Sequence, residues 1–217
     1  VANEYKVIEN SAQTFADNIN EFSGMIGERQ VGCPLVVHRR CIEPMFSISN
    51  MISYDNRMFN KTHKKEDYLK QEQPFLIKKS GWINVEGTEN GSKDHFVKNQ
   101  AERVCQLLEN ALHIYTNLYE TDDKIFIITP FRTVAESMRK FVIGYFSVKG
   151  YDKEMLTKWT RNCVGTVHTF QGKDANEVLF VLGCSDKSVG AMNWVVKKAN
   201  ILNVACTRAK YRIAFIG

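Results

Sequence analysis

Short, continuous apolar runs constrain the fold of this chain more than any other feature of its sequence. Three of them cover residues 164–167, 178–183 and 212–216, and a fourth lies at 125–129. Runs of this length are typical of strands buried on both faces, as in parallel sheets. The polar residues between the runs then lie in loops at strand ends, which is where open α/β sheets bind their ligands.

Apolar residues with helical spacing separate these runs and predict helices that cover the sheet. In residues 94–118, apolar side chains recur at intervals of three and four, which indicates a long amphipathic helix. They are Val97, Ala101, Val104, Leu108, Ala111 and Tyr115. Further helices are predicted at 11–27, 45–53, 134–148 and 200–207. We therefore expect an α/β fold with a mostly parallel central sheet and helices on both faces.

The remaining segments carry weaker patterns. Residues 35–37 predict another buried strand, and the helix at 11–27 is expected to face the core through Phe15, Ile19, Phe22, Met25 and Ile26. Residues 54–93 are expected to form an irregular insertion with short strands at 75–79 and 82–85 and an exposed loop at 86–93. The prediction is a single domain over residues 1–217, with residues 1–30 as a helical lead-in.

Composition excludes several classes of protein. With 217 residues, 44% of them hydrophobic and 24% charged, the chain is an ordinary globular one. It has neither an apolar run near the roughly 20 residues that span a bilayer nor a signal-peptide pattern, so no membrane partner is expected. The six cysteines form no Cys-x-x-Cys pair, which predicts a reducing cytoplasm and neither disulfides nor a metal site. A net charge of +5 weakly favours a polyanionic partner.

Two motifs near the C-terminus carry a resemblance to a known family. Residues 166–174 are TVHTFQGKD and residues 203–210 are NVACTRAK. They resemble motifs V and VI of superfamily 1 helicases, in the order found in the second RecA-like domain of those motors. Residues 38–40, His-Arg-Arg, resemble the Gln-Tyr-Arg segment of the 1B branch, which includes the nonsense-mediated-decay helicases. The resemblance implies a RecA-like fold of the P-loop NTPase type.

The resemblance also implies a nucleotide site. Arg208 and Arg40 would contact the γ-phosphate of ATP from neighbouring strand ends that face one cleft, and an arginine in this role can accelerate hydrolysis about 10³–10⁵-fold. Arg39, in the position of an aromatic residue, would stack on adenine by a cation–π contact. The turn at Gln171 and Gly172 would let the backbone approach the nucleotide. Asp174 would bind the ribose, although the family more often has glutamate there.

Nucleic-acid contacts are implied at two strand ends. Thr166 and His168 in the first motif would face a strand, Thr166 by donating a hydrogen bond to a phosphate. Phe131 and Arg132 follow the run at 125–129 and resemble motif IV, so they would stack on a base and contact a phosphate. Packing of Phe131 under the sheet at a helix N-terminus is an equal alternative. The basic and aromatic segment at 149–162 is compatible with either strand binding or a surface connection.

Half of an ATP site is missing from this sequence. It contains no Gly-x-x-x-x-Gly-Lys-Ser/Thr segment and no apolar strand that ends in Asp-Glu. The resemblance therefore implies that a first RecA-like domain supplies the phosphate cradle and holds Mg²⁺, with ATP bound between the two domains. We expect the second motor domain of a DNA or RNA helicase or translocase that is inactive by itself. The alternative is a degenerate module that binds nucleic acid or protein and hydrolyses nothing.

Overall fold

A five-stranded parallel sheet forms the centre of the molecule. The computed structural model describes residues 12–26, 29–32, 35–62, 75–89, 94–112, 114, 117–185, 187–197 and 199–217. The strand order is β5-β9-β8-β6-β7, and every neighbouring pair is parallel. The strands are β5 (Gly81–Ile83), β6 (Ile125–Thr129), β7 (Val164–Thr166), β8 (Ala175–Val181) and β9 (Ala209–Ile216). All four apolar runs are strands of this sheet, as predicted.

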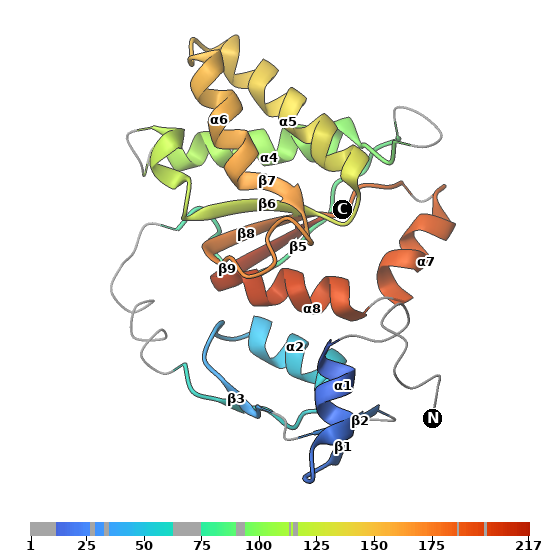
Figure 1. The fold of residues 1–217 in the computed structure, drawn as a ribbon. Helices are drawn as coiled ribbons and strands as arrows, with labels where there is room; N and C mark the ends of the chain where they lie inside the picture. Colours follow the sequence, from blue (N-terminus) through green and yellow to red (C-terminus); the bar gives the residue numbers. More distant parts are fainter. Residues whose placement is uncertain are drawn as a thin grey trace.

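Helices cover both faces of the sheet (Figure 1). On one face lie α4 (Lys98–Leu112), α5 (Arg132–Ser147) and α6 (Lys153–Cys163); on the other lie α8 (Ala199–Arg208) and, beneath it, α2 (Met45–Ser53). Successive residues of β6 pack into two separate hydrophobic cores, one on each face of the sheet, because side chains alternate across a strand. Ile125 and Ile127 pack under α4 to α6, whereas Phe126 and Ile128 pack under α8. The predicted α/β architecture, consistent with a RecA-like fold, is confirmed.

The long helices match their predicted apolar faces. Ala101, Val104, Leu108 and Ala111 of α4 are buried as expected, and so is Val97 just before the helix, while Tyr115 lies outside the described residues. Helix α2 has the predicted bounds, and α5 and α8 differ from theirs by one or two residues at each end. Apolar residues at helical spacing therefore predicted the positions of these helices well, because one face of each helix packs into a hydrophobic core. Among the residues that the structure describes, no helix is both long and apolar enough to cross a bilayer.

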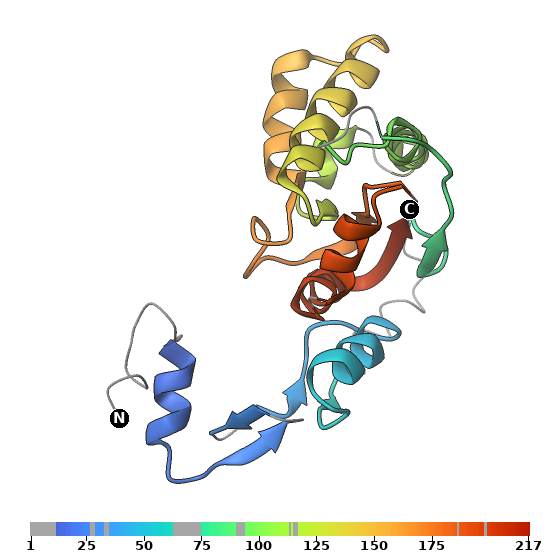
Figure 2. The ribbon, with the colours of Figure 1, turned by 90° about the vertical axis from the view of Figure 1, so that its right-hand side faces the viewer.

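The N-terminal segment differs from its prediction. Helix α1 (Ala12–Ile19) stops early, because the Asn20 side chain accepts a hydrogen bond from the Phe22 backbone N–H at 2.9 Å and forms a turn. An antiparallel hairpin, β1 (Gly24–Ile26) and β2 (Arg29–Val31), follows. Ile19 and Phe22 are each 75% exposed, so the expected core-facing helix over residues 11–27 is wrong in its second half. Figure 2 shows this segment standing apart from the sheet.

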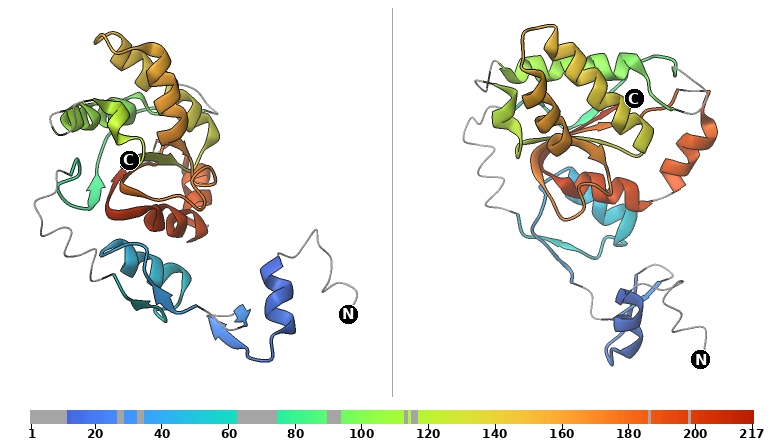
Figure 3. Two further views of the ribbon diagram at one scale, coloured as in Figure 1. Left: turned by 60° about the vertical axis from the view of Figure 1, so that its left-hand side comes forward. Right: turned by 45° about the horizontal axis from the view of Figure 1, so that its top comes forward.

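The strand predicted at 35–37 is not buried in the sheet. Leu35 is 91% exposed, and the strand β3 (Val37–His38) pairs with β4 (Phe59–Asn60) in a separate two-stranded sheet. The segment joins the body one step later, where the Ile42 backbone N–H donates to the Lys210 carbonyl at 3.1 Å. Figure 3 shows the β3–α2 segment lying below α8.

The insertion at 54–93 contains part of the central sheet. Strand β5 confirms the short strand predicted near residue 82 and forms the sheet edge beside β9. The strand predicted at 75–79 is wrong: the buried carboxylate of Glu177 accepts the backbone N–H groups of Leu76 and Ile77, at 2.8 and 2.6 Å. Those donors are therefore lost to any strand ladder. Residues 90–93 of the predicted loop lie outside the described residues, and Glu89 just before them is held by a bridge to Val97.

The basic and aromatic segment at 149–162 is mostly helix α6. Asp152 caps it by accepting the Met155 backbone N–H at 2.7 Å. Trp159 is buried, and its indole N–H donates to the Thr121 hydroxyl at 3.1 Å. This tryptophan is therefore part of the core and is not available to stack on a base.

Candidate nucleotide and nucleic-acid sites

A charged hollow lies beside the amino ends of β8 and β9. Its volume is about 590 Å³. All six residues expected to contact nucleotide line it: Arg39, Arg40, Gln171, Gly172, Asp174 and Arg208. We call it the amino-edge hollow. Its place differs from the usual one, since open α/β sheets bind ligands at the carboxyl ends of their strands.

Sheet register explains why distant residues meet in the amino-edge hollow. Ala175 of β8 pairs with Ala209 of β9, so Asp174 and Arg208 occupy neighbouring strand starts. Arg40 comes from elsewhere: it follows β3, which is not part of the five-stranded sheet. The expectation that both arginines sit on neighbouring strand ends is therefore wrong for Arg40. Its loop reaches the hollow because the following residues dock on the start of β9.

Arg208 is held tightly by the turn that precedes β8. Its Nη1 donates to the carbonyls of Phe170 and Lys173, at 3.1 and 2.9 Å. Nε donates to the Val204 carbonyl at 3.2 Å, and Nη2 to the Thr207 hydroxyl at 3.2 Å. Four of the five guanidinium N–H groups are thus used within the lobe, and the residue is 4% exposed. The side chain fastens the two helicase-like motifs to each other.

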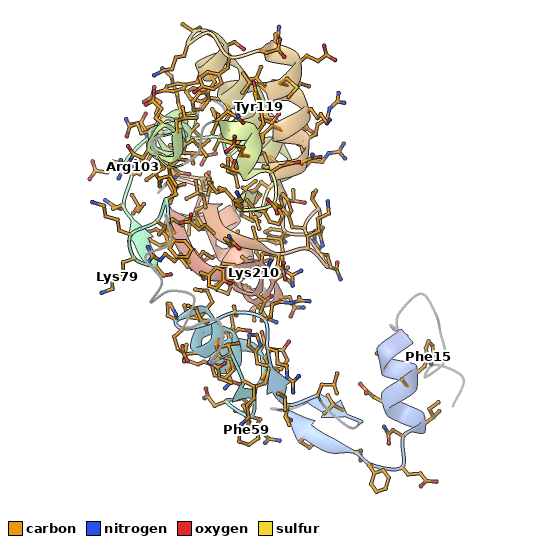
Figure 4. The ribbon with its side chains drawn as sticks, turned by 90° about the vertical axis from the view of Figure 1, so that its left-hand side faces the viewer. Phe15, Phe59, Lys79, Arg103, Tyr119 and Lys210 are labelled. Atoms are coloured by element: carbon orange, nitrogen blue, oxygen red, sulfur yellow. The ribbon has the colours of Figure 1, made fainter. Side chains whose placement is uncertain are left out.

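The amino-edge hollow has a positive field. Burial lowers the pKa of Arg208, and the charge of nearby Arg40 lowers it further, while Asp174 opposes the shift. Asp174 is partly neutralised, because its Oδ1 lies 2.8 Å from the Lys210 Nζ. Lys210, labelled in Figure 4, lies where the sheet meets the α2 segment. Like charges gathered in one concavity favour an anionic ligand.

His38 shapes the loop that presents the two other arginines. Its Nε2 accepts the Cys41 backbone N–H at 2.9 Å, which fixes the proton on Nδ1, and its ring lies 5.1 Å from that of Phe46. Arg39 and Arg40 project from this turn and are exposed. His38 is therefore a buried structural residue that positions the cationic loop.

A second hollow lies at the carboxyl ends of β6 and β7. Its volume is about 380 Å³. Three of the four residues expected to contact nucleic acid line it: Arg132, Thr166 and His168. They meet because Thr129 of β6 pairs with Thr166 of β7, so that the two following loops start side by side. We call it the carboxyl-edge hollow.

Polar groups in the carboxyl-edge hollow are largely matched by neighbours. The Thr166 and Thr169 hydroxyls lie 3.1 Å apart. Arg132 is exposed, and its Nε contacts the Glu136 carboxylate at 2.9 Å on the next turn of α5. The site thus offers hydroxyl and imidazole groups beside two arginines, one of them paired with Glu136, which suits an extended polar chain better than a concentrated charge.

Phe131 does not line either hollow. Its ring packs between those of His95 and Trp194, with centroids 4.7 and 5.7 Å away. This arrangement agrees with the packing alternative for Phe131. The exposed aromatic surface here belongs to Trp194 on α7 (Val189–Lys197), which is 40% exposed and lines the carboxyl-edge hollow. The sequence analysis assigns no element to residues 184–199 and so misses Trp194, although the mostly apolar run from Ala191 to Val196 could have indicated a helix here.

These features define a RecA-like lobe with a cationic hollow at one sheet edge and a polar hollow at the other. A family model described as an AAA domain matches residues 21–217. The chain belongs to this family and is a helicase-type nucleotide-binding domain of the superfamily 1 kind. No curated protein sequence matches it.

Proposed function

We propose that this chain is the second RecA-like motor domain of an ATP-dependent superfamily 1 helicase or translocase. The observation that carries the proposal is the amino-edge hollow, where three arginines from two distant segments gather beside the turn of the first helicase-like motif. Such a site complements a triphosphate, because guanidinium groups bind phosphate oxygens in a bidentate way. A first RecA-like domain would supply the phosphate cradle and hold Mg²⁺.

Each residue of the amino-edge hollow has a role in this proposal. Arg40 and Arg208 stabilise charge on the transferring γ-phosphoryl group, and Arg39 stacks on the adenine. Asp174 binds the ribose after exchanging its contact with Lys210. Gln171 and Gly172 bring backbone close to the nucleotide; Gly172 has a φ of +87°, which side-chain-bearing residues rarely adopt.

The carboxyl-edge hollow would hold single-stranded DNA or RNA. Thr166 and Arg132 contact phosphates and His168 contacts the backbone or a base, so that binding depends little on sequence. Phe131 supports this surface through its packing with Trp194. Closure of the two domains on ATP, and opening after hydrolysis, would move them along the strand. The described cysteines are all free and buried, which supports a cytoplasmic location.

The test is ATP turnover in the protein that carries both domains. Arg208→Ala should lower kcat about 10³-fold or more, because the transition-state charge loses its partner. Arg103→Ala, on the outer surface of α4, is the matched control and should leave kcat unchanged. Because Arg208 also holds the turn before β8, Arg40→Ala should be measured in parallel, since Arg40 lies exposed on a loop. Near-normal turnover in both hollow variants would end the proposal.

The degenerate module remains a second candidate because of one observation. Arg208 already uses four N–H groups within the lobe and is almost fully buried, which also describes a purely structural arginine. In that case Arg208→Ala lowers the melting temperature, and single-strand binding by the chain persists without any coupling to ATP. Strand affinity measured with and without a non-hydrolysable ATP analogue separates the two candidates.

A further inference from the structure

Three side chains of the kinds that bind metal ions meet at the carboxyl end of β8. They are Glu89, His95 and Cys184, and their ligand atoms all lie within 4.8 Å of one another. Glu89 Oε2 and His95 Nδ1 are 3.0 Å apart. When two ligand atoms each lie about 2.0–2.1 Å from the same zinc ion, the distance between the two ligand atoms is about this value or slightly more. The pair is therefore spaced as neighbouring ligands are.

The backbone around this cluster is held in unusual conformations. His95 and Cys184 have φ values of 54° and 60°, although neither is glycine. The Cys184 N–H donates to the His95 carbonyl at 2.8 Å, which locks the two residues together. A Cβ on Gly183 would lie only 2.8 Å from the same carbonyl oxygen, so glycine is needed there. Left-handed conformations are strained for residues other than glycine, and they concentrate at functional sites.

We propose that Glu89, His95 and Cys184 bind a divalent transition metal ion, with Zn²⁺ as the best match. One sulfur, one imidazole nitrogen and one carboxylate oxygen form a mixed donor set that Zn²⁺ accepts in tetrahedral sites. The Glu89 side chain is 8% exposed and that of His95 is 24% exposed, so the cluster is only partly open to solvent. A water molecule would take the fourth position there.

Binding has a simple proton balance. Cys184 binds as a thiolate and gives one proton to solvent. Glu89 binds as a carboxylate. His95 binds through Nδ1 as a neutral ring with its proton on Nε2, so the hydrogen bond to Glu89 is replaced by two metal–ligand bonds. One proton is therefore released for each Zn²⁺ bound, and nothing is oxidised or reduced.

Groups around the cluster support the ligands and connect them to the rest of the lobe. Glu89 Oε1 accepts the backbone N–H of Ser185 at 2.9 Å and its hydroxyl at 3.3 Å, which orients the carboxylate. The His95 ring packs on Phe131 at 4.7 Å. A bound ion would fasten the segment before α4 to the end of β8. This proposal does not depend on ATP or nucleic-acid binding.

The experiment uses Co²⁺ as a spectroscopic probe in the tag-free chain. One equivalent of Co²⁺ should give the near-ultraviolet charge-transfer band of a cobalt thiolate, and Zn²⁺ should displace it. Cys184→Ala should abolish the band, while Cys105→Ala, a buried cysteine in α4, should retain it. His95→Ala should weaken Co²⁺ affinity at least tenfold.

Absence of a thiolate band in the folded wild-type chain would overturn the proposal and leave only a hydrogen-bonded cluster. A band that survives in Cys184→Ala would also overturn it, because the ion then binds elsewhere. If Cys184→Ala fails to fold, His95→Ala and Glu89→Gln decide: unchanged affinity in both sinks the site. Added Zn²⁺ should raise the melting temperature of the wild type but not of His95→Ala.

Discussion

The two edges of the central sheet are built from different chemistry. The amino-edge hollow gathers three arginines, and its carboxylate, Asp174, is itself paired with Lys210. The carboxyl-edge hollow also contains two arginines, but both are engaged: Arg132 with Glu136, and Arg139 with the Val164 carbonyl at 2.7 and 2.9 Å. One edge therefore carries more positive charge, three arginines against Asp174, whereas the other has two arginines against Glu136 and adds hydroxyl, imidazole and aromatic groups. The first suits a compact polyanion and the second an extended chain.

A single turn belongs to both edges. Residues 166–172 begin at the carboxyl end of β7, where Thr166 and His168 line one hollow, and end at Gln171 and Gly172, which line the other. Arg208 holds this turn through the Phe170 carbonyl. Any displacement of the Arg208 guanidinium toward a phosphate would thus loosen the segment that carries the proposed strand contacts. Arg208 variants should therefore affect both ATP turnover and strand binding, whereas Arg40 and Arg132 lie outside this turn and should each affect one of the two.

The largest expected effect is on ATP turnover. Arg40→Ala in the protein with both domains should lower kcat by about 10³-fold or more, while strand affinity without nucleotide stays within twofold of wild type. Arg132→Ala should do the reverse: strand affinity falls and kcat at saturating strand remains near normal. Steady-state ATPase assays and fluorescence anisotropy with a labelled oligonucleotide measure the two quantities. If both variants lower both quantities equally, the edges are not chemically separate.

The sheet could be predicted well from the sequence, because strands that are buried on both faces appear as continuous runs of apolar residues. The sequence also grouped the residues of the amino-edge hollow: the helicase-like motifs place four of them shortly before β8 and β9, and the His-Arg-Arg segment after β3 adds Arg39 and Arg40. It failed where a local pattern was overruled by a distant partner. The apolar run at 35–37 is exposed because β3 pairs with β4, and the run at 75–79 is irregular because Glu177, about a hundred residues later, takes its backbone donors.

The candidate metal ligands show the same limit. Glu89 and His95 are close in sequence, but Cys184 is brought to them only by the position of β8 in the sheet. No Cys-x-x-Cys or His-x-x-x-His spacing signals such a set. A positive φ at a residue other than glycine is likewise invisible in the sequence. Sites assembled from strand ends can be predicted only when a motif marks both strands.

The free energy of unfolding should depend on pH through Glu177, which lies near the amino end of β8. Burial raises its pKa from 4.5 to about 7, although two backbone N–H donors and Arg212 oppose the shift. The native state then holds a proton that the unfolded chain has released, so stability is fully present below about pH 4.5 and is lost as pH rises through 7. The loss is about 3 kcal/mol.

Urea unfolding at pH 5 and pH 8 tests this expectation. The wild type should be less stable at pH 8, and Glu177→Gln should flatten the difference. Glu136 is an exposed carboxylate that lines the carboxyl-edge hollow, and Glu136→Gln is the matched control. It should show the same difference in unfolding free energy between pH 5 and pH 8 as the wild type. If Glu177→Gln keeps the wild-type difference in unfolding free energy between pH 5 and pH 8, Glu177 stays ionised over this range. The two backbone N–H donors then lower its pKa more than burial raises it.

Stacking at the carboxyl edge should depend on Trp194 more than on Phe131. Trp194 is exposed on the hollow, and base–aromatic stacking contributes about 1–3 kcal/mol for each base. Trp194→Ala should therefore weaken single-strand binding about 5- to 150-fold. Trp82→Ala, an exposed tryptophan on the edge strand β5, is the control and should leave affinity unchanged. Equal losses in the two variants would mean that Trp194 contributes only general aromatic surface.

The smallest expected effect comes from the Thr166 hydroxyl. Thr166→Val preserves the shape of the side chain and removes one hydrogen bond to a phosphate, which is worth about 1 kcal/mol or roughly fivefold in strand affinity. The Thr169 hydroxyl, which donates to or accepts from Thr166 in the free lobe, remains able to bond solvent because it is exposed, so stability should change little. Thr157→Val on α6 is the matched control. If Thr166→Val binds a single strand as tightly as the control does, while Arg132→Ala binds it weakly, the phosphate contact lies on α5 and the turn between the two hollows does not touch the strand.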